Sequence, residues 1–165
     1  MTASNPTKIW RALFAFTMLG LALLLATSSV AAASKCKKVA GKFTLTPVSG
    51  PACASEVGVC ATGSYIGVLQ ASSAFIGTSF VPTHDVATTG VFLLTGNNTI
   101  TTATGTISTQ DAIVLKTSGA GEFAEVDTVI GGTGAWANAS GTITAEGYFG
   151  SEGGAGVYMG EICTP

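Results

Sequence analysis

Two acidic residues, Glu125 and Asp127, stand two positions apart in a segment that otherwise favours a strand. Successive side chains of a strand point to opposite faces, so these acids share one face with Phe123 and Val129. If that face points into an apolar interior, desolvation and mutual repulsion raise at least one carboxyl pKa and make a proton-transfer pair. The alternative, which is the more common arrangement, is that both acids face water or hold a turn donor. Glu125 and Asp127 are our first candidate catalytic residues.

Asp111 is a third candidate catalytic residue. It follows Thr109 and Gln110 just before a predicted strand, where an aspartate most often accepts backbone N–H bonds in a turn. The single histidine, His84, follows Pro82 in a predicted loop. Histidine titrates near neutral pH, but no recognisable nucleophile motif places a serine or cysteine beside it, so we expect a surface residue.

Aromatic residues are the candidates for contacting a ligand. By default they are ordinary barrel side chains, but any that face inward would line a pocket. The candidate ligand-binding residues are Tyr65, Phe75, Phe92, Trp136 and Tyr148.

The glycine-rich segment from Gly132 to Ala137 fits the loose pattern G-x-G-x-x-A of some dinucleotide-binding loops. Such a loop joins a parallel strand to a helix whose N-terminus meets the pyrophosphate. The residues that follow, from Ser140 to Glu146, alternate as a strand and cannot form that helix. We therefore expect a tight bend between two strands and no cofactor.

Four cysteines in an exported chain indicate two disulfides, for which three pairings exist. We favour Cys53 with Cys60, which are close in sequence, and Cys36 with Cys163, which would tie the two ends of the mature chain. Zinc sites favour tighter cysteine spacing with histidines or further cysteines nearby, so we expect no metal.

The N-terminus indicates export. Lys8 and Arg11 lead into an apolar run from Ala12 to Ala26, and small residues follow up to Ala33. The run is shorter than the roughly twenty residues that a spanning helix needs. We predict a signal peptide over residues 1–33, cleaved after Ala33, rather than a lasting membrane anchor. The mature protein, residues 34–165, would be secreted or periplasmic.

Charge in the mature region argues against nucleic-acid binding. Of the seven basic residues, Lys8 and Arg11 lie in the predicted signal, which leaves five lysines against nine acids. Without a basic patch, binding to nucleic acid loses its main electrostatic term.

Short runs rich in Val, Ile, Thr, Phe and Tyr recur between Gly, Asn and Ser clusters, which predicts an all-β domain. Turn residues such as Gly96-Asn97 would join consecutive strands as antiparallel hairpins. A meander of eight or nine strands usually closes into an up-and-down barrel, which removes its exposed edges, and a sandwich is the alternative. The expected strands are 41–48, 64–70, 74–81, 90–95, 99–108, 112–117, 122–130, 141–149 and 156–162.

The segment GEFAEVDTVIGGTGAWANASGTITAEGYF, followed by GVYMGEIC, resembles the C-terminal half of the allene-oxide-cyclase-like barrel domains, which are related in architecture to plant dirigent proteins. The resemblance covers residues 121–163, is faint upstream, and implies an eight-stranded antiparallel barrel with an apolar lumen in a secreted, bacterial-type member of the family. The shared element G-G-T-G-x-[FW]-x-x-A-x-G is matched by Gly131, Gly132, Thr133, Gly134, Trp136 and Gly141.

The resemblance implies a pocket that shapes a reactive small molecule. The plant enzymes cyclise a fatty-acid epoxide, and dirigent proteins steer radical or quinone-methide coupling. No catalytic residue is carried over, because the glycine element that matches is structural rather than chemical. Dirigent sites also depend on arginine, which residues 34–165 lack, and this argues against a dirigent activity.

Three functions follow as hypotheses. We expect first a barrel that binds an apolar small molecule in its lumen. The alternatives are an isomerase, cyclase or coupling-directing protein for an apolar substrate, and a structural or surface-interaction protein whose lumen is filled. Inward-facing acids beside an open cavity would favour the enzyme, and an apolar cavity without them would favour the binder.

Overall fold

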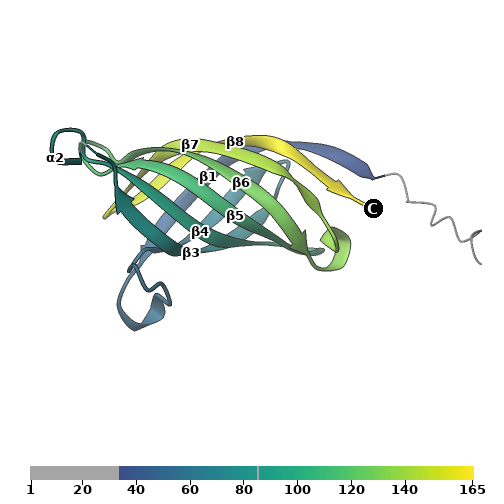
Figure 1. The fold of residues 1–165 in the computed structure, drawn as a ribbon. Coiled ribbons are helices and arrows are strands. Elements are labelled where there is room, and N and C mark those ends of the chain that lie inside the picture. The colour runs from purple at the N-terminus through teal and green to yellow at the C-terminus, as the bar shows by residue number, and fades with distance from the viewer. Residues whose placement is uncertain (1–33, 85) are drawn as a thin grey trace, which may run out of the picture. The chain divides into compact units, whose positions relative to one another are not determined.

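The computed structural model describes residues 34–84 and 86–165, which form a closed antiparallel β-barrel of eight strands (Figure 1). The strands follow one another round the barrel in chain order, and β8 pairs with β1 to close it. This confirms the predicted fold class, whereas the predicted signal peptide lies outside the described residues. No helix in the described part of the chain is long and apolar enough to span a membrane. The strands are β1 Lys35–Val48, β2 Cys60–Gly67, β3 Ala71–Pro82, β4 Val91–Thr102, β5 Gly105–Lys116, β6 Glu122–Gly132, β7 Ser140–Gly150 and β8 Gly153–Thr164.

Both predicted disulfides are present. Cys36 and Cys163 face each other in the register of β1 and β8 and join the seam at which the barrel closes. The Cys53–Cys60 disulfide lies in the connection between β1 and β2, directly after the 3₁₀ turn η1, Gly50–Ala52. Two disulfides are compatible with an oxidising extracellular or periplasmic compartment.

The prediction of a turn at Gly96-Asn97 is wrong. Both residues lie in the middle of β4, and the chain reverses at residues 103–104 instead, so the expected strand 99–108 spans the end of β4 and the start of β5. Gly96 faces the interior, where a Cβ atom would collide with the ring of Phe75. The glycine is therefore needed for close packing between strands.

The barrel has eight strands where nine strand segments were expected, because the expected segments 90–95, 99–108 and 112–117 form only the two strands β4 and β5.

The glycine-rich segment after β6 forms the predicted bend. It contains a single 3₁₀ turn, η2 (Gly134–Trp136), and then leads directly into β7. Gly134 has a φ of 59°, in the left-handed region that glycine adopts without a steric penalty. A Cβ atom there would also collide with the backbone carbonyl of Thr104.

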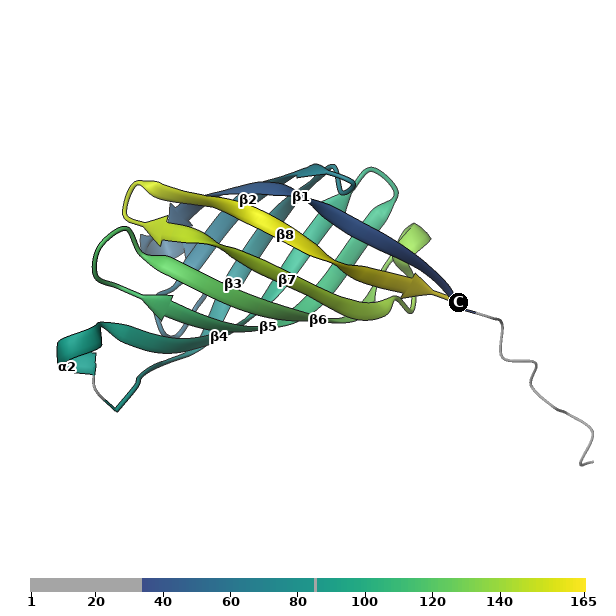
Figure 2. The ribbon, with the colours of Figure 1, turned by 90° about the horizontal axis from the view of Figure 1, so that it is seen from above.

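The barrel has two ends that differ in character. The mouth end carries the connections β1–β2, β3–β4, β5–β6 and β7–β8, and the closed end carries the other three connections. Figure 2 shows the short helix α2 (Val86–Thr89) projecting at the mouth end and the C-terminus at the closed end. Apolar side chains, each at most 3% exposed, fill the lumen towards the closed end: Val39, Leu69, Ile100, Ile107, Val129, Ile143 and Ile162.

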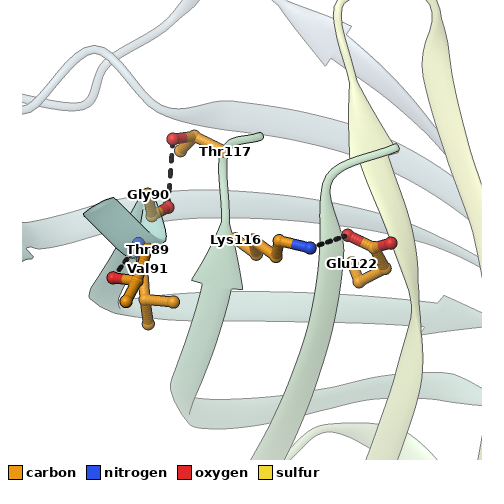
Figure 3. Close-up of polar contacts among 6 residues, drawn as sticks. All are labelled: Thr89, Gly90, Val91, Lys116, Thr117 and Glu122. Atoms are coloured by element: carbon orange, nitrogen blue, oxygen red, sulfur yellow. Dashed lines mark hydrogen bonds and ion pairs between the residues drawn. The ribbon is translucent and has the colours of Figure 1, made fainter. Parts of the chain in front are cut away.

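Polar contacts hold two connections together at the rim of the mouth end (Figure 3). The hydroxyl of Thr117 donates a hydrogen bond of 3.1 Å to the carbonyl of Gly90, which links the β5–β6 connection to the segment after α2. Lys116 Nζ lies 3.7 Å from a carboxylate oxygen of Glu122, across the same β5–β6 connection. Both side chains are about half exposed, so this ion pair contributes little to stability.

Candidate functional site

A cavity occupies the mouth half of the lumen. Its volume is about 590 Å³ when the space open to solvent is included, and about 50 Å³ of this can hold the centre of a water molecule. That is room for a few water molecules or for a slender ligand that extends into the mouth. The cavity is lined by Phe43, Leu45, Val59, Ala61, Tyr65, Ser73, Phe75, Leu94, Asn98, Ile113, Leu115, Phe123, Glu125, Ala145 and Phe149.

Aromatic rings form much of the cavity wall. The ring of Phe43 lies 6.1 Å from that of Tyr65 and 6.0 Å from that of Phe123, measured between centroids. Interior glycines make space for these rings, because a Cβ atom at Gly156 would collide with Phe43. The small residues of the strands thus accommodate aromatic side chains as well as open space.

Three acidic side chains meet on the wall formed by β5 and β6. Asp111 and Asp127 are direct cross-strand partners, and Glu125 stands two residues before Asp127 on the same face. Carboxylate oxygens of all three lie within 4.8 Å of one another. Asp127 is 1% exposed and Asp111 3% exposed, whereas Glu125 reaches the cavity. We call these three residues the acid cluster.

The position of Asp111 differs from the turn that the sequence suggested. It lies in the middle of β5 and faces inward, opposite Asp127. The local preference of aspartate for turns was overridden by the pairing of β5 with β6, which the residues around Asp111 do not reveal.

Burial raises the pKa of every carboxyl group in the acid cluster. The pKa of Asp127 rises to about 9, chiefly by desolvation and further by the charge of Glu125. The pKa of Asp111 rises to about 8, again chiefly by desolvation and then by the charge of Asp127. Desolvation also raises the pKa of Glu125, to about 7. The cluster therefore retains protons at neutral pH, and Glu125 is the member that titrates closest to neutrality.

Shared protons also account for the hydrogen bonding of the acid cluster. One oxygen of Asp111 accepts a hydrogen bond of 2.5 Å from the hydroxyl of Thr109. The other oxygen of Asp111 and both oxygens of Asp127 are buried without a hydrogen-bond partner. A protonated carboxyl group supplies an O–H donor to its neighbour, so partial protonation satisfies atoms that full ionisation leaves unpaired.

Tyr65 and Asn98 belong to the same region of the lumen. Burial raises the pKa of the Tyr65 phenol well above its ordinary value, and the nearby charge of Asp127 adds to this. Asn98 is 7% exposed, and its side-chain oxygen has no hydrogen-bond partner. Asn98 was not among the predicted site residues, because a turn was expected at Gly96-Asn97. A continuous β4 puts Asn98 on the same face as Leu94 and Ile100, which is the signal that would have identified it.

The structure places two of the five predicted ligand-contacting aromatics, Tyr65 and Phe75, in the cavity wall. The other three lie elsewhere. Phe92 stacks on Phe80 with ring centroids 4.5 Å apart, and it does not line the cavity. Trp136 lies at the closed end, where its indole N–H donates a hydrogen bond to Thr102. Tyr148 lies on the outer face of β7 and is 49% exposed, because neighbouring residues of a strand point to opposite faces and Phe149 points into the lumen.

The acid cluster is also close enough to share one cation between its carboxylates. A second group within the described residues comprises Cys36, Glu161 and Cys163, but its two cysteines are joined in a disulfide and cannot act as thiolate ligands. His84 lies in an exposed turn after β3, as predicted for a surface residue.

A second hollow lies on the outer face of β5 to β8. Its apolar residues include Val114, Val126, Val157 and Met159, all of which are substantially exposed. It lacks the enclosing walls of the lumen. We therefore take the lumen cavity with the acid cluster as the candidate site.

Comparison with known proteins gave no match to a family model, to a curated protein or to a solved structure. The resemblance to allene-oxide-cyclase-like domains rests on the residues quoted above and stays a prediction.

Proposed function

We propose that this protein is exported and binds a small, mainly apolar molecule in the mouth half of its lumen. The observation that carries the proposal is the cavity itself, which is walled by Phe43, Leu115 and Phe123 and backed by a tightly filled closed end. Eight-stranded barrels have an interior that either fills with side chains or holds one small ligand. Here the closed end is filled and the mouth end is not. The two disulfides and the signal-like N-terminus support export.

Native mass spectrometry of the protein purified from its exported fraction tests this proposal. We expect a bound mass that is released on denaturation and that can be identified after extraction. Replacing Ala145 with Leu adds volume to the cavity wall beside Glu125 and should abolish retention of that mass. The matched control is Ala124→Leu on the exposed outer face of β6, which should retain it. Absence of any bound mass in the wild-type protein, or equal retention by Ala145→Leu, would contradict binding in the lumen.

Proton transfer is a second candidate function, and the inward position of the acid cluster favours it. Glu125 lines the cavity with a pKa near 7, so it can both donate and accept a proton at neutral pH. Desolvation raises the pKa of Glu125, a hydrogen bond with Asp127 lowers it, and the charge of Asp111 raises it further. The barrel would then act as an isomerase or cyclase on an apolar substrate, the activity class that the family resemblance implies.

A small ketone serves as the probe for this activity. We expect the protein to accelerate deuterium incorporation from D₂O at the α-carbon of cyclohexanone, with Glu125 as the base that removes the proton. Glu125→Gln should remove the acceleration, and Glu146→Gln on the outer face of β7 should keep it. Equal exchange with and without the Glu125 carboxylate would exclude it from the reaction and leave the binding proposal untouched.

A further inference from the structure

The unsatisfied polar atoms of the lumen are all acceptors. Within residues 34–84 and 86–165, the buried side-chain atoms without a hydrogen-bond partner are Asn98 Oδ1, Asp111 Oδ2 and the two carboxylate oxygens of Asp127. No nitrogen or hydroxyl donor is among them. Of these residues only Asn98 lines the cavity, so the unpaired acceptor that a ligand can reach there is Asn98 Oδ1, and a ligand that complements it brings an N–H or O–H donor.

The lumen also lacks a positive partner for the acid cluster. All five lysines of the described chain are exposed, and residues 34–165 contain no arginine. Three carboxyl groups thus stand together without a cation supplied by the protein. An anionic ligand would find no positive partner here and would meet like charge as Glu125 ionises near neutral pH, so a carboxylate is disfavoured.

The surroundings of Glu125 suit an organic cation better than a bare ion. Rings of Phe43, Tyr65, Phe75 and Phe123 line the same cavity, and aromatic faces attract ammonium groups. A calcium ion prefers six to eight oxygen ligands, whereas most of this wall is apolar. A primary ammonium group carries three donors and no acceptor, which suits Asn98 Oδ1 and the carboxylate that Glu125 forms as it ionises.

We propose that the ligand of the lumen carries a primary ammonium group on an apolar body, with the ammonium group against Glu125 and Asn98 and the body along the aromatic wall. This inference rests on the proposed function, because it names the class of molecule that the cavity binds. The two aspartates behind Glu125 retain protons at neutral pH and add negative charge to this end of the cavity only as the pH rises through their pKa values of about 8 and 9.

Three six-carbon probes distinguish recognition of an ammonium group from binding of any apolar molecule in the lumen. Calorimetric titration of the exported protein with hexylammonium, hexan-1-ol and hexanoate compares one apolar body with three head groups. We expect hexylammonium to bind at least about tenfold more tightly than hexan-1-ol, since a hydrogen bond to a charged group contributes about 1.5–3 kcal/mol, and hexanoate to bind most weakly. Binding of hexan-1-ol or hexanoate as tight as that of hexylammonium overturns the inference alone. Failure of all three probes to bind overturns the lumen as a binding site.

Two single substitutions test whether the Glu125 carboxylate binds the ammonium group. Glu125→Gln should weaken hexylammonium binding by about tenfold or more and leave hexan-1-ol within about twofold. Glu146→Gln removes a carboxylate from the outer face of the neighbouring strand and should change neither affinity. An equal loss for both probes in Glu125→Gln, or a loss with Glu146→Gln, would overturn the assignment.

The pH dependence and a metal competitor complete the test. The titratable groups that face Glu125 are Asp127 on its own strand, Asp111 on β5 and Tyr65 on β2. Hexylammonium stays protonated up to pH 9, as a lysine side chain does, so its affinity should rise from pH 6 to pH 9 as the carboxyl groups ionise. A flat or falling affinity, or complete displacement by millimolar Ca²⁺, would show that the free oxygens serve another purpose and would overturn the inference.

Discussion

At the residue scale, the acid cluster makes the stability of the barrel depend on pH. Each of these carboxyl groups has a higher pKa in the folded protein than in the unfolded chain, so the folded state binds more protons between the two values. Their contribution to stability is fully present below about pH 4 and is lost as the pH rises through the folded pKa values of about 7, 8 and 9.

Asp127→Asn tests this dependence with a side chain of nearly the same shape. We expect the wild-type melting temperature to fall between pH 5 and pH 9 and the variant to fall less. Removing one titrating proton reduces the slope by about 1.4 kcal/mol per pH unit over that range. Thermal unfolding at several pH values, with Glu146→Gln as the control, measures it. A variant that loses stability with pH as steeply as the wild type would show that Asp127 is already ionised in the native barrel.

Gly96 provides a second test at a single residue. Gly96→Ala places a methyl group against the ring of Phe75 and should destabilise the barrel by about 1–3 kcal/mol through overpacking. Adding Phe75→Leu should recover part of that loss, because the clash disappears with the ring. Thr99→Ala on the outer face of the same strand should change stability by less than about 0.5 kcal/mol. Denaturant unfolding of Gly96→Ala, Phe75→Leu and the double variant measures the coupling, with Thr99→Ala as the control, and purely additive losses would argue against the contact.

At the scale of the element, alternation along the chain predicted the strands but not their inward faces. Both faces of β6 carry apolar and charged residues, so the sequence of β6 alone does not show whether Glu125 and Asp127 point inward. The choice depends on the pairing with β5 and β7, where Asp127 lies opposite Asp111 and Ile143. Asn98 was missed for a related reason, since a glycine in mid-strand resembles a turn until its cross-strand neighbour is known.

The Cys36–Cys163 disulfide joins β1 and β8 covalently at the strand seam. Removing Cys36–Cys163 by a double serine substitution should cost about 2 kcal/mol more than removing Cys53–Cys60, because the first bridge spans 127 residues and the second spans seven. Chemical denaturation of the two double variants under the same conditions measures the difference. Equal losses would indicate that the paired strands hold the seam without help from the disulfide.

At the scale of the whole molecule, apolar side chains fill one end of the barrel lumen and a cavity occupies the other end. Composition and turn spacing predicted closure, because a long antiparallel meander removes its edges by pairing its first and last strands. The division of the lumen into a filled half and an open half depends on which side chains meet across the barrel. The isoleucines of the closed end and the aromatic wall of the mouth end come from strands far apart in sequence.

Methyl-detected NMR of the protein with hexan-1-ol tests the central claim most directly, because it locates an apolar molecule without assuming its head group. We predict intermolecular contacts between the hexyl chain and the methyl groups of Leu115 and Ala145 in the lumen. The methyl groups of Val126 and Met159, in the outer hollow, should show none. Contacts confined to that outer hollow, or no contacts at a saturating alcohol concentration, would contradict the account.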